Sequence, residues 1–110
     1  MSKIVITKRG GTWSAAALME FKRLTGIALT VIKEASAGDP IFECELFLND
    51  HDAVAVALRG VMALDRSEGL SLGYFELEPD EDFATAPLDR CQIDAGILEN
   101  ILAEADSLSR

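Results

Sequence analysis

The apolar positions of the first 25 residues predict a strand followed by a helix. Residues 4–7 form a β-branched run that stops at two glycines, which is typical of a short strand. Thr12 or Ser14 then offers a side-chain oxygen that can accept the first unpaired amides of a helix. The next apolar positions recur at helical spacing and should form the buried side of that helix: Ala17, Leu18, Phe21 and Leu24.

Gly26 predicts a corner between this helix and a shorter second helix. Glycine readily adopts the left-handed conformation that ends many helices. Helical spacing then resumes at Leu29, Ile32 and Ala35. Gly38 should end the second helix, and Pro40 prevents its continuation because proline has no backbone N–H.

Residues 41–47 alternate in pattern, which predicts a second strand with one buried face. One set of positions is expected to face the core: Phe42, Cys44 and Leu46. The other set is expected on the opposite face, with its two glutamates in solvent: Ile41, Glu43, Glu45 and Phe47.

Residues 51–66 predict a third helix, and residues 70–77 predict a third strand. Gly60 lies in the middle of that helix, where glycine costs about 1 kcal/mol relative to alanine. A close approach by another element would explain it, and a tolerated flaw is the alternative. In the strand, the parity of the apolar positions changes at Gly73, so a β-bulge or a sharp twist is expected there.

The last third of the chain adds an acidic connector and one more helix. Residues 79–92 contain four carboxylates and two prolines, as in a solvated linker. Residues 93–110 are amphipathic, and a helix is expected over about residues 93–108. Its apolar stripe consists of Ile97, Leu98, Ile101, Leu102 and Ala105. This stripe should either cover part of the chain's own core or join two copies of the chain in a homodimer.

These elements predict an α+β fold in the order β-α-α-β-α-β, with an extra C-terminal helix. The arrangement is a two-layer sandwich, in which helices cover one face of a three-stranded antiparallel sheet. The first strand should lie between the other two, and the second face of the sheet is expected to be open. Residues 1–78 would form the sandwich, residues 79–92 the connector, and residues 93–110 a helix of the same domain or of a dimer.

Charge is unevenly distributed along the 110 residues. Residues 1–38 carry six cations and two carboxylates, whereas residues 39–110 carry four arginines and seventeen carboxylates, and the net charge is −9. This excess of carboxylates argues against general nucleic-acid binding, which needs cations to replace phosphate counterions. A dipolar surface of this kind could steer charged protein partners.

Hydropathy and cysteine placement bear on the cellular compartment in which the chain is expected. No apolar run approaches the ~20 residues of a membrane-spanning helix, and the N-terminus lacks the apolar segment of a signal peptide. The chain is therefore expected in the cytoplasm, without a membrane as partner. Cys44 is expected in the core and Cys91 in the connector, and neither has neighbours at the spacing of a disulfide or metal site.

Two groups of polar residues have the composition of metal sites. Residues 49–52 lie at a helix start, where consecutive side chains point in different directions, so His51 is expected to be exposed and not a ligand. The carboxylates of residues 76–82 lack the glycine and final glutamate of a calcium loop. No convergent acid–base pair stands out, so we expect a non-enzymatic protein without a metal or cofactor.

One segment of the chain resembles a known family. It reads Lys22-Arg-Leu-Thr-Gly-Ile-Ala-Leu-Thr-Val-Ile-Lys33, and it is similar to the helix–Thr-Gly–helix corner of the C-terminal domain of the bacterial ribosomal stalk protein. The order of elements over residues 3–77 is also the order of that domain and of the wider ClpS-like fold. The resemblance therefore implies this fold for residues 3–77.

In the stalk family this corner is a basic and apolar surface that recruits the GTPase factors of translation. The first helix here carries alanines and Glu20 where the stalk domain has several lysines. What carries over is the fold and protein binding at the corner. The candidate partner-binding residues are Lys22, Arg23, Thr25, Gly26, Leu29 and Lys33.

Two functions are consistent with these features. The first is a small cytoplasmic, non-enzymatic module that binds an unidentified protein at the corner. The alternative is an acidic inhibitory protein, such as a toxin-immunity protein, that masks a basic surface with the acidic part of the chain. A homodimer through the C-terminal helix stays open, and neither nucleic acid nor a membrane is expected as a partner.

Overall fold

The computed structural model describes residues 3–9, 13–45, 51–78, 80–86 and 88–108, although the side chains of residues 51, 52, 88 and 105–108 are not part of that description. The elements run in the order β1 (Lys3–Thr7), α1 (Ala15–Thr25), α2 (Leu29–Glu34), β2 (Pro40–Glu45), α3 (His51–Glu68), β3 (Gly73–Leu77), α4 (Leu88–Cys91), β4 (Gln92–Ile93) and α5 (Ala95–Leu108). The α+β class and the β-α-α-β-α-β order are therefore confirmed.

Among the residues that the structure describes, four antiparallel strands form the sheet, in the order β2-β1-β3-β4. The central position of β1 was predicted and is confirmed, because β2 and β3 pair with its two sides. The prediction of three strands is wrong, since Gln92 and Ile93 pair with Phe75 and Tyr74 of β3. A two-residue strand is too short to show the alternation by which strands are recognised.

A bulge in β2 corrects the predicted faces of that strand. Ile6 pairs with Phe42 and Thr7 pairs with Pro40, so Ile41 is an extra residue in β2. Ile41 is buried in the same core against which Phe42 packs, although alternation placed the two on opposite faces. Cys44 packs against this core as predicted, and Glu43 and Glu45 are exposed. Leu46 and Phe47 lie outside the described residues.

Of the two alternatives expected at Gly73, a β-bulge or a sharp twist, the bulge is not observed. Pairing between β1 and β3 runs without interruption from Thr7 and Gly73 to Lys3 and Leu77. A Cβ atom on Gly73 would lie 2.4 Å from Oγ1 of Thr7, so any side chain here would require the Thr7 side chain or the strands to shift. The change in apolar parity has another cause, because β3 is buried on both faces of the sheet.

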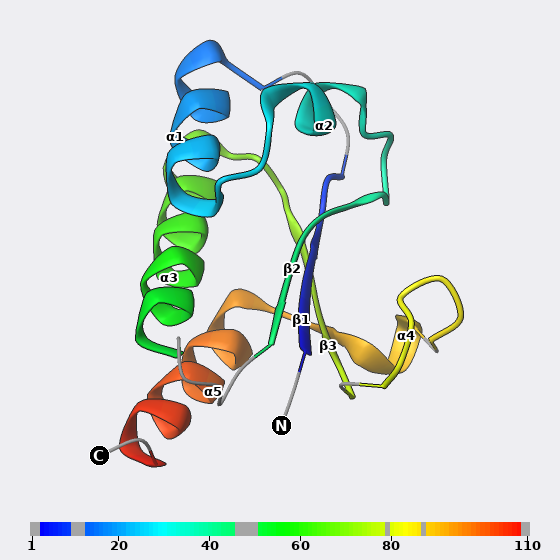
Figure 1. Cartoon of the computed structure of the whole chain (residues 1–110), viewed down its shortest axis with the longest axis vertical. Coiled ribbons are helices and arrows are strands. Elements are labelled where there is room, and N and C mark those ends of the chain that lie inside the picture. Colours follow the sequence, from blue (N-terminus) through cyan, green and yellow to red (C-terminus); the bar gives the residue numbers. More distant parts are fainter. Residues whose placement is uncertain (1–2, 10–12, 46–50, 79, 87, 109–110) are drawn as a thin grey trace.

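Helices cover one face of the sheet and enclose the main core. Figure 1 shows α1 and α3 side by side on this face, with α2 at one end of the sheet and α5 at the other. The side chains that are fully buried here come from strands and helices alike: Ile4, Ile6, Phe21, Ile32, Leu58, Val61, Leu98 and Leu102. Trp13 packs edge to face on Phe21, with ring centroids 5.3 Å apart.

Gly60 marks a close approach between α1 and α3. A Cβ atom on Gly60 would lie 2.5 Å from Cδ2 of Leu24 in α1. The prediction of a close neighbour at this glycine is therefore confirmed. Ala17 and Phe21, on the same buried side of α1 as predicted, are fully enclosed.

The turn between α3 and β3 is organised by Asp65. Its main-chain oxygen accepts hydrogen bonds from the amides of Gly69 (2.8 Å) and Leu70 (3.2 Å). Its carboxylate accepts one from the amide of Leu72 (3.3 Å) and one from the hydroxyl of Tyr74 (2.9 Å). These contacts hold a turn in which Ser71 has a positive φ of 57°.

The second face of the sheet is covered, which corrects the expectation of an open face. The described residues from Glu78 to Cys91, hereafter the acidic strap, fold back over this face (Figure 1). Phe83, Ala86 and Cys91 pack there on a small core of sheet residues: Val5, Phe75 and Leu77. The rings of Phe75 and Phe83 meet edge to face at 5.3 Å. The predicted linker is therefore partly a structural element.

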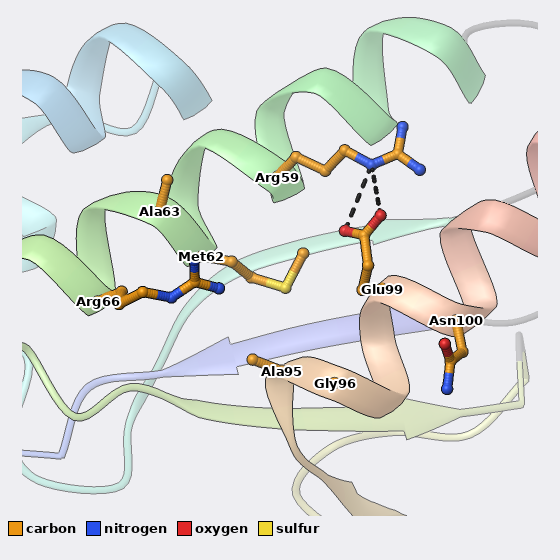
Figure 2. Close-up of a pocket in the computed structure, with 8 residues that line it drawn as sticks. All are labelled: Arg59, Met62, Ala63, Arg66, Ala95, Gly96, Glu99 and Asn100. Carbon is orange, nitrogen blue, oxygen red and sulfur yellow. Dashed lines mark hydrogen bonds and ion pairs between the residues drawn. The ribbon is translucent and has the colours of Figure 1, made fainter.

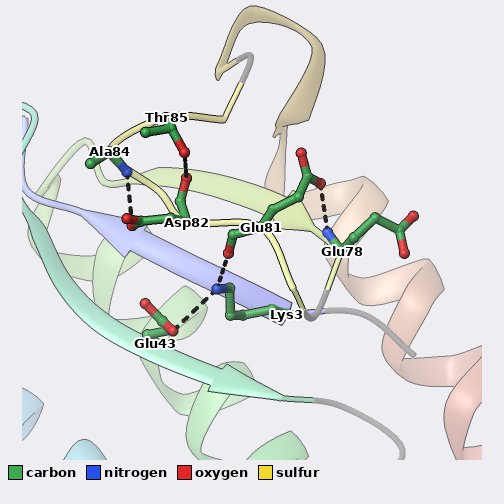
Figure 3. A network of polar contacts seen from close by, with 7 residues as sticks. All are labelled: Lys3, Glu43, Glu78, Glu81, Asp82, Ala84 and Thr85. Carbon is green, nitrogen blue, oxygen red and sulfur yellow. Dashed lines mark hydrogen bonds and ion pairs between the residues drawn. The ribbon is translucent and has the colours of Figure 1, made fainter.

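Lys3 fastens the acidic strap to the sheet. Its ammonium group donates a hydrogen bond to the main-chain oxygen of Glu81 and lies 3.5 Å from Oε1 of Glu43 in β2 (Figure 3). Two strap carboxylates are used internally, because Glu81 accepts from the amide of Glu78 at 2.8 Å and Asp82 from the amide of Ala84 at 3.2 Å. The side chain of Lys3 is buried as a result.

The C-terminal helix packs on its own domain. α5 begins at Ala95, after Asp94 accepts a hydrogen bond from the amide of Ile97 at 2.8 Å. Leu98 and Leu102 are fully buried in the main core, whereas Ile97 is 45% exposed. Leu98 and Leu102 of the predicted stripe therefore cover part of the chain's own core, and the homodimer stays a prediction. No helix in the described part of the chain has the length and apolar character needed to cross a membrane.

Candidate functional site

The predicted corner is formed by α1 and α2. Ser14 begins α1, because its side-chain oxygen accepts a hydrogen bond from the amide of Ala17 at 3.1 Å. Gly26 ends the helix with a φ of 76°, and its amide donates to the main-chain oxygen of Lys22 at 2.7 Å. After two further residues, α2 begins at Leu29. The glycine corner and its sequence signals are thus confirmed.

Thr25 and Gly26 shape the corner from within. The hydroxyl of Thr25 donates to the main-chain oxygen of Phe21 at 2.8 Å and accepts from the amide of Ile27 at 3.2 Å. These two bonds tie the last turn of α1 to the start of the connection. The Thr-Gly pair therefore sets the direction in which α2 leaves, which is a structural contribution to the site.

The cations of the corner are all exposed, but they are not equivalent. Arg23 donates from Nε to both carboxylate oxygens of Glu20, at 3.0 and 3.1 Å, one turn earlier in α1. This hydrogen bond lowers the pKa of Glu20 and raises the pKa of Arg23. Lys22 and Lys33 are exposed on the two helices. The charge of Arg23 is partly satisfied within the chain, so the two lysines are the more available cations.

Exposed apolar side chains accompany these cations. Met19 of α1 is 56% exposed, and Val31 of α2 is 49% exposed. Leu29 is half-buried, so it supports α2 as well as presenting part of its side chain. Large apolar groups in solvent become favourable contacts once a partner covers them. Met19 was not among the predicted site residues, because it follows Leu18 in an apolar run and carries no charge.

Two of the six cations counted in residues 1–38 do not contribute to an exposed basic surface. Lys3 and Lys8 are both buried, on β1 and just after it. Lys8 donates from Nζ to the main-chain oxygen of Ile32 at 3.0 Å, which satisfies a carbonyl in the last turn of α2. The basic character of residues 1–38 is therefore smaller at the surface than in the sequence.

The other polar groups do not converge. Among the residues described, no three or more histidine, cysteine, aspartate or glutamate side chains gather in a way that could hold a metal ion. Asn49 and Asp50 lie outside the description, and of His51 only its place at the start of α3 is described. Cys44 and Cys91 pack on opposite faces of the sheet, and burial with nearby carboxylates raises the pKa of the Cys91 thiol.

A cleft between α3 and α5 was not foreseen from the sequence. Its volume is about 510 Å³ (Figure 2), and its lining residues are Arg59, Met62, Ala63, Arg66, Ala95, Gly96, Glu99 and Asn100. The four residues of α3 follow the spacing of one helical face, which is visible in the sequence. That α5 lies opposite this face depends on tertiary packing, which the sequence pattern did not reveal.

Comparisons with known proteins leave the family open. No family model, no curated protein and no solved structure matches the chain. The likeness to the stalk C-terminal domain therefore remains a prediction that rests on the segment from Lys22 to Lys33 and on the order of the elements.

Proposed function

We propose that the chain is a small cytoplasmic, non-enzymatic module that binds a protein at the corner of α1 and α2. The observation that carries the proposal is that both helices expose a large apolar side chain, Met19 and Val31, together with the cations Lys22 and Lys33. Further support comes from the order of elements from β1 to β3, which is the order of the stalk C-terminal domain.

The partner should offer an apolar surface rimmed by carboxylates. Met19 and Val31 would supply affinity by losing contact with water, as apolar anchors do at the centre of protein interfaces. Lys22 and Lys33 would favour an acidic partner and speed its encounter. Thr25 and Gly26 set the angle between the helices, so their effect on binding is indirect.

Photo-crosslinking tests the proposal with a matched control. A photoreactive phenylalanine analogue replaces Val31 in one variant and Val56 in the other, because Val56 is an exposed valine (67%) on α3. In the native cell, position 31 should form a defined crosslinked species that position 56 does not form. Mass spectrometry then identifies the partner.

A charge-reversal variant connects the crosslink to the proposed cations. Lys22→Glu with Lys33→Glu should reduce the yield at position 31 about tenfold or more, since each lost charged contact weakens binding by about 1 kcal/mol. The melting temperature should change little because both lysines are exposed. An unchanged yield in the folded double variant would mean that the corner is not the binding surface.

The acidic strap favours a second candidate, an inhibitory protein that masks a basic surface. Four of its carboxylates are exposed, at Glu78, Asp80, Asp82 and Asp89, and Lys3 and Phe83 hold the strap in place. A preformed acidic surface suits a basic enzyme partner. One experiment distinguishes the two candidate functions. Replacing these four carboxylates by amides would abolish binding to a basic enzyme if the chain is an inhibitor, but it would leave the crosslink at position 31 unchanged if the corner binds the partner.

A further inference from the structure

The cleft between α3 and α5 combines an apolar base with two arginines. Met62 is nearly buried and belongs to the main core, so its side chain forms the inner part of the cleft. Arg59 and Arg66 lie two turns apart on the same side of α3, on either side of Met62 (Figure 2). Ala95 and Gly96 at the start of α5 are small, so the opposite wall leaves room for a ligand.

The two arginines differ in how they are held. Arg59 donates from Nε to Oε1 of Glu99 at 3.1 Å, a contact that joins α3 to α5. Arg66 forms no hydrogen bond or ion pair with any residue in the part of the chain that the structure describes. Its guanidinium group points along α3 toward the cleft (Figure 2). Arg66 is therefore the group available to a ligand.

The charge of the cleft is opposite to that of the molecule. Its lining carries two arginines and one carboxylate, whereas the whole chain has a net charge of −9. The N-terminus of α5 adds a partial positive charge, which Asp94 partly offsets at the cap. An anionic group would therefore be attracted to this cleft more than to the surrounding surface.

The size of the cleft fits a small molecule. A volume of about 510 Å³ lies within the range of roughly 300–1,000 Å³ that is typical of ligand pockets. Arginine presents donors in a planar fork that matches a carboxylate or a phosphate. Met62, Ala63 and Ala95 offer apolar contact beside that fork.

We propose that this cleft binds a small organic anion. Its carboxylate or phosphate group pairs with Arg66, and its apolar portion lies against Met62 and the alanines of the two helices. Arg59 remains bound to Glu99 and keeps the two walls together. This site is separate from the corner of α1 and α2, so either proposal stands or fails without the other.

An NMR titration of the full chain tests the site with four probes. Benzoate and phenyl phosphate carry both an anionic group and an apolar ring, benzamide is a neutral analogue, and inorganic phosphate lacks the ring. Benzoate or phenyl phosphate should shift the amide signals of Ala63, Arg66, Ala95 and Gly96 in a saturable manner. Benzamide and inorganic phosphate should bind at least about tenfold more weakly, because each lacks one of the two contacts.

Two arginine variants decide the role of Arg66. Arg66→Gln should weaken benzoate and phenyl phosphate binding about tenfold, a typical loss for a charge-assisted hydrogen bond. Arg90→Gln is the matched control, because Arg90 is an exposed arginine of α4 outside the cleft. Unchanged spectra elsewhere would show that both variants fold.

Three outcomes would overturn the proposal. The first is equal binding of benzoate and benzamide, which would remove the need for an anion. The second is an equal effect of the two arginine variants, which would indicate general electrostatics. The third is that no probe shifts the signals of α3 and the first turn of α5, which would place any binding elsewhere. The proposal stands only if Arg66→Gln alone weakens the two aromatic anions.

Discussion

At the scale of single residues, Asp65 and Tyr74 connect the end of α3 to the sheet. The carboxylate of Asp65 accepts a hydrogen bond from the hydroxyl of Tyr74, and Asp65 also closes the turn in which Ser71 has a positive φ. Burial, together with the hydrogen bond to Asp65, raises the pKa of the Tyr74 phenol well above its usual range. The folded chain therefore holds this proton more tightly than the unfolded chain does, where the pKa is about 10.

The sign of the effect on stability follows from that shift. Tyr74 makes its full contribution to the free energy of unfolding below about pH 10. This contribution is lost as the pH rises further, because the phenol of the unfolded chain ionises at a lower pH than the phenol of the folded chain. We predict that phenolate absorbance appears only well above pH 10 and together with unfolding. Tyr74 is the sole tyrosine, so an ultraviolet absorbance titration reports on it alone. A midpoint near pH 10 in a chain that stays folded would contradict the prediction.

At the scale of elements, the acidic strap is the feature that most changes the predicted fold. It converts β3 from a strand with one buried face into a strand buried on both faces. In the part of the strap that the structure describes, three apolar side chains pack on the sheet and Lys3 donates one hydrogen bond to the strap. Local opening of such an element should cost less free energy than unfolding of the whole chain.

The reactivity of Cys91 measures this opening. We predict that Phe83→Ala accelerates maleimide labelling of Cys91 about tenfold, since a loss of about 1.4 kcal/mol in local packing raises the open population by that factor. Mass spectrometry of peptides separates Cys91 from Cys44. Phe42→Ala is the control, because Phe42 is also half-buried but packs on the other face of the sheet. Equal acceleration by both variants would indicate global destabilisation instead.

The helices and strands that were predicted correctly are those marked in the sequence by local residues or by regular apolar spacing. Phe21 recurs at helical spacing, Ser14 precedes its helix, and Gly26 follows it, so each signal lies within a few residues of its effect. The covering of the sheet by Phe83 depends on a contact with Phe75 that no local pattern encodes. For the same reason the bulge at Ile41 and the cleft beside α5 were missed.

At the scale of the whole molecule, the proposed binding corner and the acidic strap belong to different parts of the fold. The corner of α1 and α2 lies with the helices, while the acidic strap lies over the other face of the sheet (Figure 1). Four carboxylates of the strap are exposed, at Glu78, Asp80, Asp82 and Asp89. The Cα radius of gyration is 13.4 Å, close to the roughly 13 Å expected of one domain of this length. The basic part of the charge asymmetry inferred from the sequence is smaller at the surface, because Lys3 and Lys8 are buried.

Burial of Leu98 and Leu102 leads to an expectation for the oligomeric state. These two residues of the α5 stripe are already enclosed in the chain's own core, so they are not available to hold two copies together. We predict a monomer of 11.9 kDa in light scattering coupled to size-exclusion chromatography. A doubled mass that Ile97→Glu returns to the monomer value would instead assign a dimer interface to the exposed side of α5.

The two edges of the sheet have a consequence for aggregation. β2 is an outer strand, and its start at Pro40, its bulge at Ile41 and its exposed glutamates oppose pairing with another strand. β4 closes the other side with only two residues. Strand-to-strand polymerisation is thereby disfavoured at both edges of the described sheet.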